Sequence, residues 1–212
     1  NTEAADKLFA LVLNQESAEE WKSIAQFGLI RSRYAVKDWE GVVSAYRKGV
    51  FKLSDDVRAQ MFLMVGNAFQ KLGDSDQAIK VYGILENFFK DREEGKEAAY
   101  RKLLVYYEGG KEELIAVADN FIEQLRLRDP ASKFIDRALL LKAEHYFAAK
   151  DYTNAVAEYD QIRAANISDS YRAAFHYQRG WALANLAQFQ AATSAFSQFL
   201  TLAPEVNPRD PT

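Results

Sequence analysis

Residues 173–205 read AAFHYQRGWALANLAQFQAATSAFSQFLTLAPE, and this stretch predicts two helices joined by a short turn. The helices are expected over residues 173–186 and 189–202. Gly180 stands near the middle of the first helix, and Ala192 stands near the start of the second. A glycine inside a helix costs about 1 kcal/mol relative to alanine, so its presence needs a packing reason. Small side chains at both positions would let the two helix axes approach to roughly 8–10 Å.

Apolar side chains recur along both predicted helices at helical spacing. Leu183 lies three residues after the glycine, and Phe196 and Leu200 lie four and eight residues after the alanine. Each helix therefore has one apolar stripe that can pack against its partner. Pro204 is expected to end the second helix, because proline lacks the backbone N–H that a helix interior requires.

The order of these residues resembles the tetratricopeptide repeat family. When Ala173 is counted as position 1, the family's signature positions 8, 11, 17, 20, 24 and 32 carry Gly180, Leu183, Phe189, Ala192, Phe196 and Pro204. His176 replaces the usual tryptophan at position 4, and Phe199 replaces the usual alanine at position 27. The resemblance implies an all-α fold, a right-handed α-solenoid of antiparallel helix pairs.

Weaker copies of the unit recur back to the first residue. We expect a single solenoid over residues 1–206, followed by a tail at 207–212. Its units are the second helix of a truncated repeat and then five repeats, at 1–15, 17–53, 56–94, 96–130, 132–168 and 170–205. The register of the unit at 96–130 is not fixed by its sequence.

The spacing of the position-8 residues gives the repeat length, which lies between the lengths typical of two families of helical repeat. Ile30 and Gly66 are 36 residues apart, Gly66 and Ala143 are 77 apart across two repeats, and Ala143 and Gly180 are 37 apart. These repeats are longer than the roughly 34 residues of an ordinary tetratricopeptide repeat, and HEAT repeats of about 40–47 residues are the alternative. The Ala-x-x-x-Tyr/Phe helices and Asp-aromatic turns favour the tetratricopeptide assignment.

Several element ends are marked by local signals. Ser17, with Glu20 three residues later, is typical of a capping box. The second helix of that repeat is expected to end near Leu53, and Ser132 is expected to cap the helix that follows Pro130. The acidic segment DREE at 91–94 is predicted to be a solvated loop, with an acidic ion site as the alternative.

Composition and motifs exclude several kinds of function. The 212 residues carry a net charge of −3 and no cysteine, so neither a basic nucleic-acid surface nor a thiolate site is expected. The two histidines, His145 and His176, lack the spaced partners of a metal site, and both are interpreted as half-buried helix residues. No phosphate-binding glycine loop, nucleophile elbow or membrane-spanning run is present. We therefore expect a non-catalytic protein with no cofactor and no metal.

The resemblance also implies where a partner binds. In tetratricopeptide proteins the concave groove is lined by positions 2, 5, 9, 12 and 13 of each first helix. The residues predicted to bind a partner there are Phe27, Arg31, Tyr34, Asn67, Gln70, Arg137, Glu144, Phe147, Tyr177 and Trp181; Gln60 and Leu63 occupy groove positions beside them. Only Asn67 matches the set that clamps a C-terminal carboxylate, so that ligand is disfavoured. Packing between repeats is the alternative role for the aromatic members.

The last repeat suggests a second surface. From Ala173 to Pro204 the one formally charged side chain is Arg179. Solenoids usually end in a polar capping helix, and none is visible after this repeat. We therefore expect Phe189, Phe199 and Leu202 to be partly exposed and to serve an end-on interface, including homo-oligomer formation.

The functional expectation is a protein–protein interaction scaffold that binds a peptide or a partner subunit in its groove. The alternatives are an oligomerisation module of a cell-envelope complex and the recruiting arm of an enzyme. The long repeats and the Asp-Pro-Ala-Ser junction at 129–132 are similar to bacterial cell-envelope tetratricopeptide proteins. This likeness favours the bacterial periplasm or the outer membrane over the cytoplasm.

Overall fold

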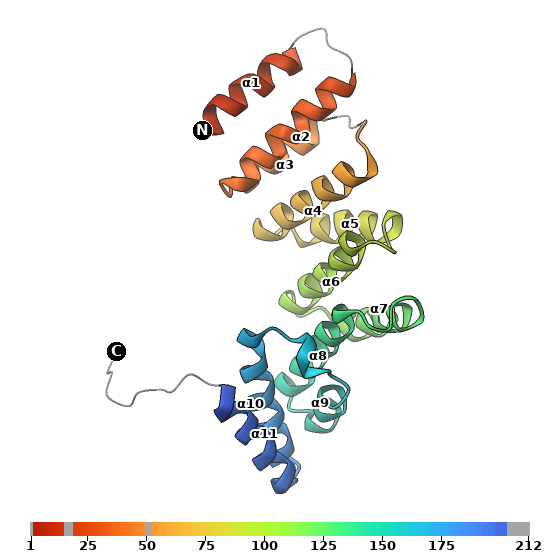
Figure 1. Ribbon diagram of the computed structural model, residues 1–212, viewed down its shortest axis with the longest axis vertical. Coiled ribbons are helices and arrows are strands. Elements are labelled where there is room, and N and C mark those ends of the chain that lie inside the picture. The colour runs from red at the N-terminus through yellow and green to blue at the C-terminus, as the bar shows by residue number, and fades with distance from the viewer. Residues whose placement is uncertain (1, 15–18, 50–51, 203–212) are drawn as a thin grey trace, which may run out of the picture. The chain divides into compact units, whose positions relative to one another are not determined.

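The computed structural model describes residues 2–14, 19–49 and 52–202, and the described residues contain helices and no strand. Contacts divide the chain into two compact units, Asn1–Gly109 and Gly110–Thr212, which are described separately below. The first unit holds α1 Thr2–Asn14, α2 Glu19–Ala35, α3 Trp39–Lys48, α4 Asp55–Lys71, α5 Ser75–Phe88 and α6 Glu93–Glu108 (Figure 1). The second unit holds α7 Leu114–Arg128, α8 Lys133–Ala148, α9 Tyr152–Tyr159, the one-turn 3-10 helix η1 Ala164–Asn166, α10 Asp169–Asn185 and α11 Phe189–Leu202.

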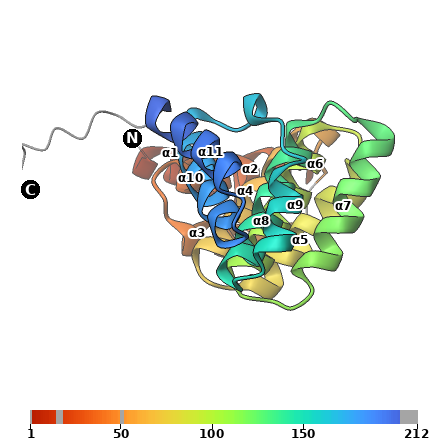
Figure 2. The ribbon, with the colours of Figure 1, turned by 90° about the horizontal axis from the view of Figure 1, so that it is seen from below.

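The predicted helix pair at the end of the chain is confirmed as α10 and α11, which lie side by side in both views (Figures 1 and 2). The predicted capping box at Ser17 lies outside the described residues. The loop expected at 91–94 is shorter than predicted, because Glu93 and Glu94 form the first turn of α6. Carboxylates favour a helix N-terminus, where the backbone N–H groups are unpaired. The predicted unit at 96–130 contributes its first helix to one compact unit and its second helix to the other.

Glycines at position 8 allow two helix pairs to pack closely. A Cβ atom built on Gly66 would lie 2.5 Å from Cε1 of Tyr82, and one on Gly180 would lie 2.7 Å from Cε1 of Phe196. Neither distance is compatible with a side chain. The aromatic ring of the second helix therefore lies directly against the backbone of the first, which confirms the packing reason expected for Gly180.

The turns inside the repeats share one local structure. Asp38, Asp74 and Asp151 begin the second helices, and each side chain accepts a hydrogen bond from the backbone N–H three residues later. This bond satisfies one of the donors that a helix N-terminus leaves unpaired. The residue before each aspartate is in the left-handed conformation; these residues are Lys37, Gly73 and Lys150, and Ala187 has the same conformation in the last turn.

The first helices of successive repeats pack against one another. In the first unit α2 contacts α4 and α4 contacts α6, while α3 contacts both α2 and α4, and α5 contacts both α4 and α6. In the second unit α8 contacts α10, and α9 contacts both. Each unit therefore has a continuous row of first helices, which we call its first-helix surface. The buried core lies between the two layers and includes Ile30, Met61 and Tyr82 in one unit and Tyr159 and Leu183 in the other.

Two second helices are short, and a buried polar side chain holds the loop that follows each. α3 has 10 residues and ends at Lys48 rather than near Leu53, and α9 has 8 residues, whereas α5 and α11 have 14 each. After α3, the backbone N–H of Lys52 donates to Oγ of buried Ser23 at 2.9 Å. The early helix ends therefore coincide with a loop fixed to the first helix of the same repeat.

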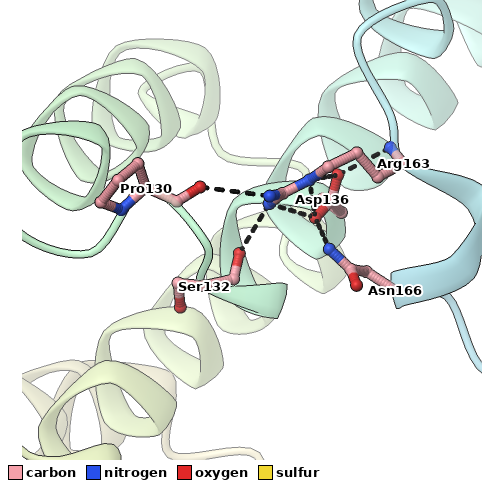
Figure 3. A network of polar contacts seen from close by, with 5 residues as sticks. All are labelled: Pro130, Ser132, Asp136, Arg163 and Asn166. Atoms are coloured by element: carbon pink, nitrogen blue, oxygen red, sulfur yellow. Dashed lines mark hydrogen bonds and ion pairs between the residues drawn. The ribbon is translucent and has the colours of Figure 1, made fainter.

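The loop after α9 is held by hydrogen bonds and an ion pair to Asp136, which is fully buried (Figure 3). The backbone N–H of Arg163 donates to Asp136 Oδ1 at 2.8 Å, and its guanidinium donates to Oδ2 at 2.7 Å. Asn166 Nδ2 donates to Oδ2 at 2.6 Å. The same guanidinium also donates to the carbonyl oxygens of Pro130 and Ser132, so the start of α8 is joined to the loop before α10.

Candidate partner-binding surfaces

A chain of hydrogen bonds crosses the first-helix surface of the first unit. Asn67 Nδ2 on α4 donates to the Tyr34 hydroxyl on α2 at 2.9 Å. The Tyr82 hydroxyl on α5 lies 2.7 Å from Asn67 Oδ1 and 3.0 Å from Gln70 Oε1, and it donates its proton between them. Gln70 Nε2 then donates to Glu108 on α6 at 3.0 Å. Three first helices are therefore linked by polar side chains.

The two central residues of this network, Tyr82 and Asn67, are buried. Tyr82 is fully buried, and this burial raises the pKa of its hydroxyl, a rise that the nearby Arg101 guanidinium partly offsets. Asn67 is also buried, and both ends of its amide are bonded inside the unit. The structure thus places Asn67, predicted to contact a partner, in the floor of the surface rather than at its exposed rim.

Side chains that a partner can reach border this floor. Arg31 on α2 and Gln60 on α4 are exposed, and so is Ile24. Phe27 and Leu63 are half-buried and belong to the apolar layer packed on the core. A partner would meet apolar groups with a cationic and an amide group beside them, over helices that hydrogen bonds hold together.

The first-helix surface of the second unit is more aromatic. Phe147 on α8 packs its edge against Tyr152, with ring centroids 5.7 Å apart. The Arg137 guanidinium lies 5.5 Å from the centroid of the Phe134 ring, which is a cation–π arrangement. Glu144 is half-buried on the same helix. Phe147 and Arg137, both predicted to bind a partner, therefore also contact aromatic side chains within the unit.

Tyr177 and Trp181 of α10 contact aromatic side chains of α11. Tyr177 has ring centroids 6.2 Å from Phe196 and 5.2 Å from Phe199, and Trp181 lies 5.7 Å from Phe196. We call these four residues the aromatic cluster. Tyr177 and Trp181 remain 44% and 45% exposed. Sequence position alone assigned both residues to the groove, and it missed the contact of Tyr177 with Phe199, which replaces the family's small residue.

The predicted end-on residues lie on α11, where several apolar side chains are exposed. Phe189 is 68% exposed, Leu202 is 38% exposed, and Phe199 is half-buried. Leu200, expected in the buried stripe, is instead 70% exposed. At 100° per residue, Leu202 lies on a different side of α11 from Leu200, whereas Phe189, Phe196 and Leu200 share one edge.

A cleft with a volume of about 570 Å³ lies elsewhere in the first unit, lined by Leu13 of α1, Gln26 and Leu29 of α2, and Ala45 of α3. Gln26 and Leu29 lie roughly 100–160° around α2 from Phe27 and Arg31. This cleft is therefore separate from the first-helix surface.

Sites for chemistry are limited in the described ranges. Between residues 2 and 202, leaving out 15–18 and 50–51, no group of His, Cys, Asp and Glu could hold a metal ion. His145 is half-buried and His176 is buried. Nδ1 of His176 has no hydrogen-bond partner. Burial is the main cause that lowers the pKa of this imidazole, and the positive charges of Arg179 and Arg172 lower the pKa further. None of the helices that the structure describes is long and apolar enough to cross a bilayer.

Comparisons with known proteins agree with this architecture. A sequence model of the tetratricopeptide repeat matches residues 59–83 and 173–206. BtubC (BKLC) from P. vanneervenii shares 12% sequence identity with a TM-score of 0.65, over 100% of this chain and 93% of that one. An ArsTM double mutant of MamA RS-1 shares 16% identity with a TM-score of 0.61, over 93% and 94% of the two chains.

A crystal structure of nearly identical TPR-like repeats from Podospora anserina has 16% identity and a TM-score of 0.57, over 92% of this chain and 100% of that one. None of the curated proteins compared matches the chain in sequence. At these identities the solved structures establish the fold alone. The chain therefore has two segments that match the sequence model of the tetratricopeptide repeat, and it shares the fold of a solved structure with TPR-like repeats.

Proposed function

We propose that this protein is a non-catalytic adaptor that holds a peptide or a partner subunit on the first-helix surface of its first unit. Tetratricopeptide repeats generally mediate protein–protein interaction, and the chain carries such repeats. The observation that carries the proposal is the layered construction of this surface. Exposed Arg31 and Gln60 and half-buried Phe27 and Leu63 lie around the Tyr34, Asn67, Tyr82 and Gln70 network.

This construction suits recognition for two physical reasons. The hydrogen bonds fix three helices before a partner arrives, so less conformational entropy is lost on binding. Aromatic and arginine side chains supply the largest share of binding energy at most interfaces, and both kinds are present here. The net charge of −3 offers no basic field that would favour nucleic acid as the partner.

The test compares two charge reversals of equal size. Peptides selected from a display library on the wild-type protein are titrated against Arg31→Glu and against Lys80→Glu; Lys80 is an exposed residue of the second helix α5. We expect Arg31→Glu to raise the Kd about tenfold or more and Lys80→Glu to leave it unchanged. Equal affinity for both variants would remove the first-helix surface from the proposal.

The same comparison separates this role from its alternatives. An oligomerisation module of an envelope complex would keep its assembly in the Arg31→Glu variant. A recruiting arm of an enzyme would bind the peptide in the same way but would change the turnover of a linked catalytic domain. The full-length gene would show such a domain directly.

We also propose a periplasmic or outer-membrane-associated location in a bacterium. Its support is the sequence alone, through the long repeats and the Asp-Pro-Ala-Ser junction at 129–132. Cell fractionation of the full-length protein in its own host provides the test, and recovery in the cytosol would contradict the proposal.

A further inference from the structure

Position 24 carries an aromatic side chain in four repeats, and these side chains differ in how deeply they are buried. Tyr82 of α5 and Tyr159 of α9 occupy position 24 and are almost fully buried. In both repeats a following first helix, α6 or α10, packs on the second helix. Phe196 of α11 occupies the same position and is half-buried, as is Tyr46 of α3, although α4 packs on α3. Half-burial at position 24 therefore does not by itself mark a missing helix. The neighbours of Phe196 on α11 show the exposed surface instead, because Phe189 is 68% exposed and Leu200 is 70% exposed.

The described side chains at the exposed surface of this repeat include an apolar group, and none that is described there carries an unpaired charge. We call this group the end face, and it consists of Tyr177 and Trp181 of α10 with Phe189, Phe196, Phe199 and Leu200 of α11. The sequence of α11, FQAATSAFSQFLTL, contains no charged residue. Arg179 of α10 is paired with Asp160 at 2.7 Å. Arg172 donates to the carbonyl oxygens of Ala164 and Ile167.

The absence of charge on α11 bears on which kind of partner can bind the end face. Surface helices of monomeric proteins usually carry charged residues, and charge depletion with aromatic enrichment marks the centre of an interface. Two copies of one face bring like charges together, so an uncharged face is well suited to pair with itself.

From these observations we propose that two copies of this chain associate through their end faces, in a two-fold arrangement that brings α10 and α11 of one copy against α10 and α11 of the other. Trp181 and Leu200 lie at the centre of the contact. The exposed polar residues of α11 are serine, threonine and glutamine; the hydroxyls of Thr193, Ser197 and Thr201 donate to backbone carbonyl oxygens of α11 and can still accept a hydrogen bond.

The test is the mass of the protein in solution, measured by light scattering over a wide range of concentration. We expect a concentration-dependent dimer for the wild type and a monomer for Leu200→Glu. Leu127→Glu is the matched control, because Leu127 of α7 is 76% exposed and Leu200 is 70% exposed. This control adds the same charge at a similarly exposed leucine of the same unit, and it should leave the dimer intact.

A mixing experiment tests the two-fold arrangement. Leu200→Glu and Leu200→Lys should each be monomeric, whereas their equimolar mixture should recover dimer, because opposite charges then meet across the axis. A wild type that is monomeric at every concentration, or a dimer that Leu200→Glu does not weaken, would overturn the proposal. A mixture that stays monomeric would overturn the two-fold arrangement. None of these results depends on peptide binding at Arg31, so the two proposals can fail separately.

Discussion

Ser23 and Asp136 occupy the same position in their repeats, and each accepts the backbone N–H of a loop that follows a shortened second helix. The donors are Lys52 at 2.9 Å and Arg163 at 2.8 Å. Where the second helix keeps 14 residues, position 1 is alanine: Ala59 precedes α5 and Ala173 precedes α11. A buried polar side chain at position 1 thus occurs where the second helix ends early. The loop that replaces the end of the helix has backbone N–H groups that need a hydrogen-bond acceptor, and this side chain provides one.

Replacing these two residues should have unequal costs. Asp136→Ala removes a buried carboxylate from Arg163 and Asn166, and breaking a buried ion pair costs roughly 3–5 kcal/mol. The Arg163 side chain is 45% exposed, so we expect about 2–3 kcal/mol. Ser23→Ala loses the bond from Lys52 and the bond that Ser23 Oγ donates to the Glu19 carbonyl oxygen, and it should cost about 1–2 kcal/mol. Urea unfolding measures both, with exposed Asp160→Ala as the control, and equal losses would contradict this assignment.

Two glycines make a matched pair for packing. In Gly66→Ala the new Cβ would meet the Tyr82 ring, which its hydroxyl contacts hold in place. We expect a loss of about 1–3 kcal/mol, as for other overpacked cores. Gly83 of α5 has no atom within 4 Å of its built Cβ, so Gly83→Ala should stabilise the protein by about 1 kcal/mol. Thermal unfolding should therefore move in opposite directions for the two variants.

The last turn departs from the other turns at two neighbouring positions. Ala187 holds the left-handed conformation that Gly73 holds in an earlier repeat, at φ 58° and 77°. Gln188 precedes α11, whereas α3, α5 and α9 are each preceded by a capping aspartate. Ala187→Gly should relieve a strain of about 1–2 kcal/mol, part of which the added freedom of the unfolded chain cancels. Gln188→Asp should add about 1 kcal/mol. Denaturant unfolding checks both, and Gly73→Ala should destabilise the protein.

His176 should make stability depend on pH in a defined direction. Burial first, and then Arg179 and Arg172, lower the pKa of this histidine below its ordinary value of about 6.5. The folded protein therefore prefers the neutral imidazole, and the unfolded chain binds a proton more readily. Stability is full above the unfolded pKa and falls as the pH drops below about 6.5 towards the folded value.

The corresponding experiment compares wild type with His176→Gln by chemical unfolding at about pH 7.5 and about pH 5.5. The wild type should lose more stability between the two values, because glutamine does not titrate. An equal loss in both proteins would show that other groups cause the pH dependence.

Much of the fold was open to prediction because it depends on local chemistry. Gly180 with Phe196, and Asp151 at its helix start, follow from steric fit and from backbone N–H groups that need acceptors. The first turn of α6 was missed because DREE resembles a solvated loop, although carboxylates also favour a helix N-terminus. The success or failure of each of these predictions depended on residues close together in the sequence, within one repeat.

The candidate surfaces were harder to predict, because they depend on long side chains that reach across helices. Asn67 lies at a groove position, yet the Tyr34 and Tyr82 hydroxyls turn it into a buried link. Trp181 also lies at a groove position, yet it joins an aromatic cluster with α11. Position numbers give the direction of a Cβ and do not give the partner that the rest of the side chain finds.

The lack of charge on α11 determines how dissolved salt acts on the two surfaces of this molecule. Screening weakens contacts made by an exposed cation such as Arg31, because the Debye length falls to about 3 Å in 1 M salt. Sulfate and phosphate strengthen the burial of apolar groups, because these ions are excluded from the protein surface. Ammonium sulfate should therefore tighten contacts at the end face while it loosens electrostatic contacts at the first-helix surface, so the choice of buffer selects which surface is occupied.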